Sequence, residues 1–149
     1  MEGSAAALPR IRYQRSPEAE EAVRRLVDAL NLSHIRVDRV YVAVSRGSRT
    51  SALARIWGIP APFTRLGVCE PAYVIELVHE NLRGADCEEL VAVVVHELLH
   101  IPRGFSGGLR AHGEWSRWGN IMRLVRGLPE DVRRDTCRLL RRALEAAPG

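Results

Sequence analysis

The feature that most constrains this chain is an apolar run that contains three polar side chains. Residues 90–101 read LVAVVVHELLHI, and without His96, Glu97 and His100 they would be plain hydrophobic core. Burying a charged group without a partner costs on the order of several kcal/mol. A fold of this chain must therefore supply these three side chains with a partner.

The spacing His96-Glu97-Leu98-Leu99-His100 indicates what that partner is. Residues four apart lie on one face of a helix, so both imidazoles can bind one ion, at about 2.0–2.1 Å if it is zinc. Glu97 lies about 100° further round the helix, where it is better placed to take a proton from metal-bound water than to be a ligand. The alternative is that both histidines bond to the backbone inside the core and Glu97 pairs with an arginine.

A catalytic zinc site needs a third protein ligand and an open position for water. His112 is the first candidate, because the glycine-rich segment 103–108 can fold back and bring it to the ion, and because Gly113 follows it at the start of a predicted helix. The weaker candidates are Glu114 downstream and Glu76 and His79 upstream. We expect His79 and His34, which lie beside predicted strands, at the surface.

The rest of the sequence predicts helices and short strands in one domain, residues 1–149. Helices are predicted after the N-caps Ser16 and Asp86, over 115–125 with Trp115 and Trp118 facing inward, and from Pro129 onward. Strands are predicted over 40–44, 52–57 and 73–78, with a polar loop at 45–51. Propensity alone leaves the valine-rich middle of 90–101 ambiguous between helix and strand.

The composition of the chain limits which cellular location and which binding partners we expect. The chain has 149 residues, a net charge of +4, and arginine for all 22 of its basic residues. No apolar run approaches a membrane span, and the first residues do not resemble a secretory signal, so we expect a cytoplasmic protein with no membrane partner. Cys69, Cys87 and Cys137 form no CxxC pair, and we expect buried or idle thiols rather than a disulfide framework.

The stretches YVIELVHENL, CEELVAVVVHELLHI and AHGEWSRW resemble the SprT-like zinc metallopeptidases. ARIWGIP and HELLHIPRGFSGGLRAHG resemble more closely a group of small archaeal and phage proteins classed as metallopeptidases, and the resemblance covers about residues 40–122. It implies an α+β, zincin-like core: a small mixed or antiparallel sheet packed on the HExxH helix, with flanking N- and C-terminal helices. It also implies His96, His100 and His112 as zinc ligands and Glu97 as the general base. Unlike typical SprT-like proteins, this chain has no C-terminal cysteine-based zinc ribbon.

We therefore expect a zinc-dependent metallopeptidase that acts on a peptide or protein substrate, with the 73–78 strand as a possible edge for an extended peptide. The alternative is a metal-binding protein without catalysis, for instance with Glu114 closing the site. A weak nucleic-acid association through the arginines of 46–49 and of the last helix is compatible with either function. Small zinc ribonucleases with three histidines carry glycine where this chain has Glu97, which argues against that activity.

Overall fold

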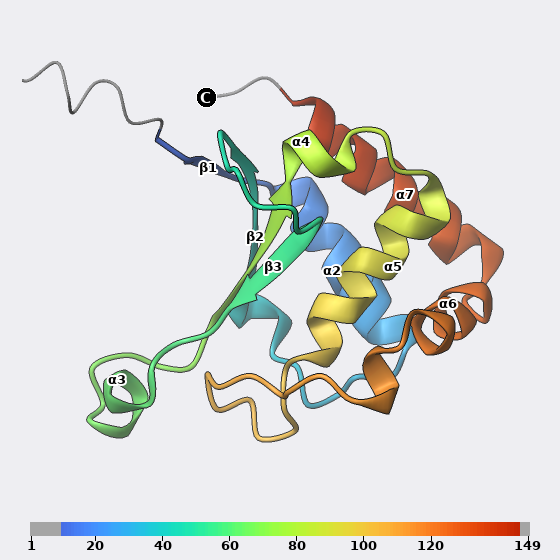
Figure 1. Ribbon diagram of the computed structural model, residues 1–149. Helices are drawn as coiled ribbons and strands as arrows, with labels where there is room; N and C mark the ends of the chain where they lie inside the picture. The colour runs from blue at the N-terminus through green and yellow to red at the C-terminus, as the bar shows by residue number, and fades with distance from the viewer. Residues whose placement is uncertain (1–9, 147–149) are drawn as a thin grey trace, which may run out of the picture.

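A computed structural model gives the structure of the chain and describes residues 10–146. The elements, in chain order, are β1 (Arg12–Arg15), α2 (Pro17–Ala29), the 3-10 helix η1 (Val37–Arg39), β2 (Val40–Arg46), β3 (Ala54–Trp57), α3 (Ala61–Arg65), β4 (Tyr73–Val78), α4 (His79–Leu82), α5 (Cys87–Leu99), the 3-10 helix η2 (Glu114–Ser116), α6 (Trp118–Arg126) and α7 (Glu130–Glu145) (Figure 1). The expectation of a mixed α+β fold with a small sheet is confirmed.

The four strands form one sheet in the order β1-β2-β4-β3. The pair β2–β4 is parallel, and the pairs β1–β2 and β3–β4 are antiparallel. Figure 1 shows α2, α5, α6 and α7 gathered on one side of this sheet, with α3 projecting beyond its end. The expectation that the 73–78 strand offers a free edge is wrong: β4 lies between β2 and β3, and the edge strands are β1 and β3.

The apolar run that opens α5 is explained by its place in the middle of the fold. α5 contacts β3, α6 and α7, so almost its whole circumference faces protein. Every residue from Leu90 to Val95 is buried as a result. The ambiguity between helix and strand is resolved in favour of a helix because this segment is surrounded by other elements, and the local valine propensity is overridden.

Both predicted N-caps are present. The Ser16 hydroxyl accepts from the Ala19 backbone N–H at 3.1 Å, and the Asp86 carboxylate accepts from the Glu89 N–H at 2.9 Å. Such bonds satisfy N–H groups that have no partner in the first turn of a helix. They fix where α2 and α5 begin.

The thiols are not idle, and that expectation is wrong. Cys87, the first residue of α5, forms a disulfide with Cys137 of α7, while Cys69 is free and exposed. Closing a loop with a sequence separation of 50 residues stabilises a fold by about 4 kcal/mol in the chain-entropy model. Disulfides are uncommon in reducing compartments, so cysteine usage gives no support to a cytoplasmic location. Within residues 10–146, no helix combines the length and the apolarity that a bilayer crossing demands.

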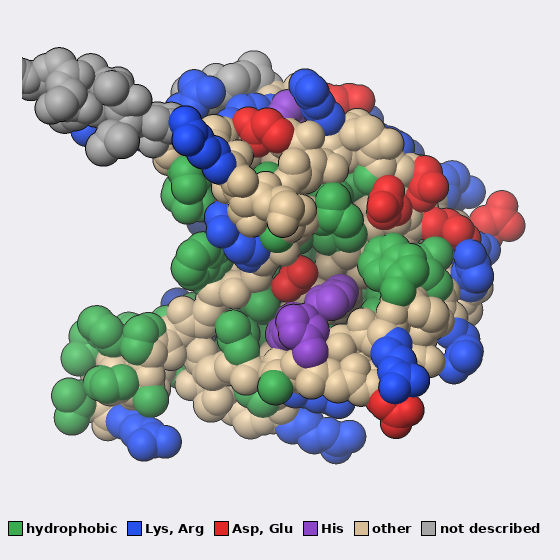
Figure 2. Space-filling view, in the orientation of Figure 1, with side chains coloured by type: hydrophobic (Ala, Val, Ile, Leu, Met, Phe, Trp, Pro, Cys, Tyr) green, Lys and Arg blue, Asp and Glu red, His purple; other side chains and the backbone are tan. Residues whose placement is uncertain are grey.

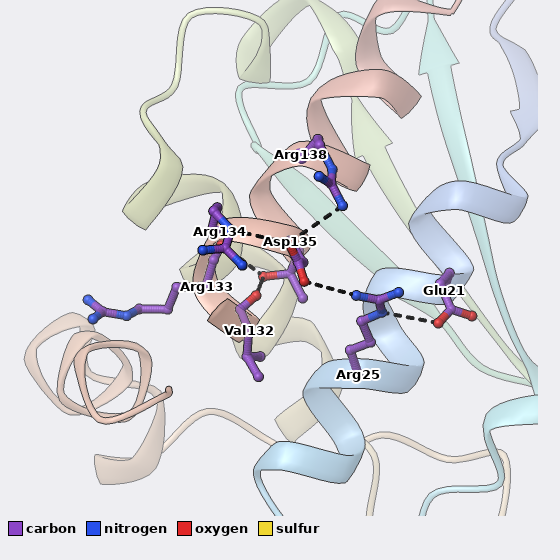
Figure 3. A network of polar contacts seen from close by, with 8 residues as sticks. Glu21, Arg25, Val132, Arg133, Arg134, Asp135 and Arg138 are labelled. Carbon is purple, nitrogen blue, oxygen red and sulfur yellow. Dashed lines mark hydrogen bonds and ion pairs between the residues drawn. The ribbon is translucent and has the colours of Figure 1, made fainter. Parts of the chain in front are cut away.

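Polar contacts between α2 and α7 lie at the surface. Arg25 on α2 bonds to Glu21 at 3.2 Å and to Asp135 of α7 at 3.3 Å, and Arg138 approaches Asp135 at 3.5 Å (Figure 3). Exposed ion pairs contribute about 1 kcal/mol or less each. The apolar side chains between the two helices, which include Val23, Leu26 and Leu140, therefore account for most of this packing.

The structure departs from the expected elements at two places, the end of β2 and the start of α6. Residues 45 and 46 extend β2 rather than opening a loop, and Arg46 donates to the carbonyl oxygens of Leu144 and Ala146. The predicted 115–125 helix is interrupted at Arg117, whose backbone is extended. Trp118, the first residue of α6, is 46% exposed, so the expectation that it is packed into the core is wrong.

Candidate metal centre

Three histidine side chains from two parts of the chain meet at the C-terminal end of α5. His96 lies in the last turns of the helix and His100 is its C-cap residue. The Nε2 atom of His112, from the segment between α5 and η2, lies 3.2 Å from Nε2 of His96 and 3.2 Å from Nε2 of His100. Within residues 10–146 these three form the one group of potential ligands whose donor atoms all lie within 4.8 Å of one another.

The segment that carries His112 is anchored to β4 and to the chain after β3. The hydroxyl of Tyr73 accepts from the N–H of Gly107 and donates to the carbonyl of Gly108, both at 2.8 Å. The N–H of Ile59 donates to the carbonyl of Gly107 at 2.8 Å. Phe105 is buried with its ring centroid 5.0 Å from that of Tyr73. These contacts bring the segment back past the end of α5.

Two glycines permit this anchoring. Gly107 has φ +94°, a conformation that L side chains rarely adopt. A Cβ on Gly58 would lie 2.0 Å from the carbonyl oxygen of Gly107, so any other residue at position 58 would push the two segments apart. The glycine-rich sequence was the basis for expecting the fold-back, and the structure shows which glycine of the segment has the special backbone.

The His100 ring is held with the lone pair of Nε2 directed into the cluster. Nδ1 of His100 lies 2.6 Å from the carbonyl oxygen of Arg110. Because that oxygen only accepts, Nδ1 carries the hydrogen and Nε2 keeps its lone pair. Burial, followed by the neighbouring His100 and His112, lowers the pKa of His96. Burial also lowers the pKa of His100, although its bond to the Arg110 carbonyl acts the other way. Both shifts favour the neutral imidazole, which is the form that binds metals.

The donor set fits a metal ion. Four ligands placed tetrahedrally at about 2.0–2.1 Å from an ion are about 3.3 Å from one another, close to the 3.2 Å that separates His112 Nε2 from its two neighbours. A neutral imidazole nitrogen carries at most one hydrogen, so hydrogen bonds pair three such atoms poorly. One cation accepts all three lone pairs.

Glu97 lies beside the histidines and has no partner among residues 10–146. Its carboxylate is buried, and no side chain or backbone group within residues 10–146 forms a hydrogen bond or ion pair with it. Burial raises the pKa of Glu97 to about 7. The alternative in which Glu97 pairs with an arginine therefore has no support among the described residues.

The histidines and Glu97 open onto a cleft of about 590 Å³ between β3 and α5. Its other lining residues are Leu53, Ala54, Arg55, Ile56, Trp57, Val93, Leu109 and Trp118. Figure 2 shows histidine side chains at the centre of this face, with an acidic side chain next to them and hydrophobic side chains around. A volume of this size is typical of ligand-binding sites.

Trp115 closes the side of the cluster that does not line the cleft. Its ring centroid lies 5.8, 5.0 and 6.3 Å from those of His96, His100 and His112. Its Nε1 donates to the carbonyl of Ala111 at 3.1 Å, which fixes the ring. Sequence periodicity placed Trp115 in the core stripe of a helix, and nothing in the sequence indicated that it contacts all three histidines.

The weaker ligand candidates lie outside the cluster. Glu114 is exposed in η2, and Glu76 is fully buried and bonded to Arg55 and Trp57. His79 opens α4, is half-buried rather than at the surface, and lines a separate pocket with Arg46. His34 is half-buried rather than at the surface, with Nε2 3.2 Å from the carbonyl oxygen of Ile101.

Fold and site together define a mixed α+β protein with a three-histidine site for a metal ion, an arrangement that fits a metal-dependent peptidase. The chain belongs to the family described as putative phage metallopeptidase, whose model matches residues 11–140. The matched segment runs from β1 into α7 and contains the whole histidine cluster. No curated protein and no solved structure matches the chain significantly.

Proposed function

We propose that this chain is a zinc-dependent metallopeptidase that hydrolyses bonds of a peptide or protein substrate. In this proposal His96, His100 and His112 hold the zinc ion and Glu97 is the general base. The observation that carries it is the convergence of three imidazole nitrogens, at 3.2 Å contacts, beside a carboxylate that no described residue pairs with.

A zinc ion bound by three imidazoles supplies a Lewis acid, which lowers the pKa of a coordinated water toward about 7 and polarises a carbonyl. The protein contributes the proton transfers. Glu97 accepts the proton of the attacking water and passes it to the leaving amine. The carbonyl of Arg110 holds the His100 ring in the tautomer that leaves Nε2 available. The ring of Trp115 packs beside all three imidazoles.

Substrate binding is supported by the free edge of β3. Of the strands in residues 10–146, β4 alone pairs with β3, so the other edge of β3 presents unpaired backbone N–H and C=O groups. Residues 54–57 of this strand line the cleft opposite His96 and Glu97. An extended peptide that pairs with such an edge has its backbone fixed along the cleft.

The test is peptide hydrolysis by the zinc-loaded protein and its variants. Glu97→Gln should bind zinc as the wild type does and lose about 100- to 10,000-fold in kcat, the range for loss of a general base. His96→Ala should lose both zinc and hydrolysis. Equal rates in Glu97→Gln and the wild type would remove Glu97 from the mechanism.

Glu114→Gln is the matched control, because Glu114 is an exposed glutamate outside the cluster. It should keep both the zinc and the rate. Loss of zinc in this variant, together with an inactive wild type, would instead support a closed, non-catalytic metal site.

A further inference from the structure

Three large apolar side chains stand half in solvent around the candidate active site. Trp57 is 48% exposed, Leu109 48% and Trp118 46%, and all three line the cleft that contains the histidines. They come from separate places in the chain: the end of β3, the segment before His112 and the start of α6. A group of exposed apolar side chains is costly in water and commonly marks a binding surface.

Packing within the protein does not account for their positions. The buried residues of α6 are Ile121, Met122 and Val125, whereas Trp118, at the N-terminal end of the same helix face, stays 46% exposed. The ring of Trp57 is fixed by a hydrogen bond from its Nε1 to Oε1 of the buried Glu76 at 2.9 Å, with the Arg55 guanidinium 5.4 Å from its ring centroid. A ring fixed in advance loses little entropy when a ligand packs on it.

The cleft offers a substrate no free charge besides the residues of the candidate site. Arg55 is the one arginine in the lining, and its guanidinium is bonded to both carboxylate oxygens of Glu76, at 3.2 and 3.0 Å. The rest of the wall is apolar, with Leu53, Ala54, Ile56 and Val93 beside the three rim residues. A charged substrate side chain would therefore lose its water there without gaining a partner.

We infer that this site selects peptides with a bulky apolar side chain, aromatic or branched aliphatic, next to the scissile bond. The inference rests on the proposed peptidase function and specifies its substrate class. Trp57, Leu109 and Trp118 form the contact surface for that side chain, and acidic and basic side chains are discriminated against by desolvation.

The test uses a set of quenched fluorescent peptides that are identical except for one central residue, which is Phe, Leu, Asp or Arg. With zinc-loaded protein, kcat/KM for the Phe and Leu peptides should exceed that for the Asp and Arg peptides by about 10- to 100-fold. Leu109→Ser and Trp118→Ser should each lower this ratio several-fold. Leu124→Ser, an exposed residue of α6 that does not line the cleft, should leave it unchanged.

A second measurement separates this inference from the proposed function. Calorimetry measures the affinity of zinc-loaded Glu97→Gln for the same four peptides. An inactive wild type together with tighter binding of the Phe and Leu peptides would refute the peptidase function and keep the apolar recognition. Equal or reversed preference in both assays would overturn the inference, and so would an unchanged ratio in Leu109→Ser and Trp118→Ser.

Discussion

Trp115 is the residue that shapes the histidine cluster without offering a ligand. Its ring centroid lies within 6.3 Å of those of all three imidazoles. The guanidinium carbon of Arg110 lies over the Trp115 ring, 4.8 Å from its centroid. The Arg110 backbone meanwhile fixes the tautomer of His100. Residues 110 and 115 thus hold the imidazoles in place from the side away from the cleft.

Trp115→Ala should weaken zinc binding by about 10- to 100-fold, the usual effect of removing a group that orients metal ligands. Trp115→Phe, which keeps an aromatic wall, should recover most of the affinity. Zinc affinity measured by competition with a chelator checks both values. Trp118→Phe serves as the control, and an unchanged affinity in Trp115→Ala would show that the ring has no positioning role.

For single residues, the sequence predicted positions in the site that depend only on neighbouring residues in the chain. His96 and His100 could be assigned to one site because the helix repeat alone puts them on one face. His112 could be proposed from the glycines before it. Trp115 could not, because its contacts depend on the path of the segment from 101 to 113, which is set by Tyr73 and Ile59 far away in the sequence.

Among the elements, β4 has a second role as the anchor of the segment that carries His112. The Tyr73 hydroxyl bridges Gly107 and Gly108, and its side chain is almost completely buried. Removal of the hydroxyl leaves a buried N–H group without its acceptor, which costs about 1–3 kcal/mol.

Tyr73→Phe should therefore lower the free energy of unfolding by about 2 kcal/mol and also weaken zinc binding, because His112 is no longer held beside α5. Urea denaturation and chelator competition measure the two effects. Tyr13→Phe removes the hydroxyl of a tyrosine that is 55% exposed and should change neither. A loss of stability with unchanged zinc affinity would show that the Tyr73 hydroxyl stabilises the fold without positioning His112.

Elements with a strong local pattern were predicted well, and those defined by their neighbours were not. The 73–78 strand was predicted with the bounds that β4 has, and α2 and α5 begin after the predicted caps. β1, with the polar sequence RYQR, was missed because its strand conformation comes from pairing with β2. The edge position of β3 is likewise a property of the sheet order, which no local pattern encodes.

For the molecule as a whole, Glu76 is the buried charge that ties the edge strand to the sheet. It is fully buried on β4 and accepts hydrogen bonds from Arg55 and Trp57 of β3. Burial alone would raise the pKa of Glu76, but these bonds and the charge of Arg55 outweigh it and hold the pKa below the usual value of 4.5.

A carboxyl group whose pKa is lowered by folding stabilises the native state above its unfolded pKa, and that contribution is lost as pH falls through the native pKa. Glu76→Gln should therefore have a lower free energy of unfolding than the wild type at neutral pH. This difference in free energy should become smaller as the pH falls below 4.5. Urea denaturation of both proteins from neutral to acid pH measures this difference in free energy. A difference that stays constant with pH would contradict this role for Glu76.

The central claim is that one ion is held by three imidazoles, and metal content measures it most directly. Elemental analysis of purified protein should find one zinc per chain in the wild type and in His79→Ala, whose histidine lies outside the cluster. His112→Ala should retain much less zinc after dialysis. A metal-free wild type of undiminished stability, or a His112→Ala variant that keeps its zinc, would contradict the account.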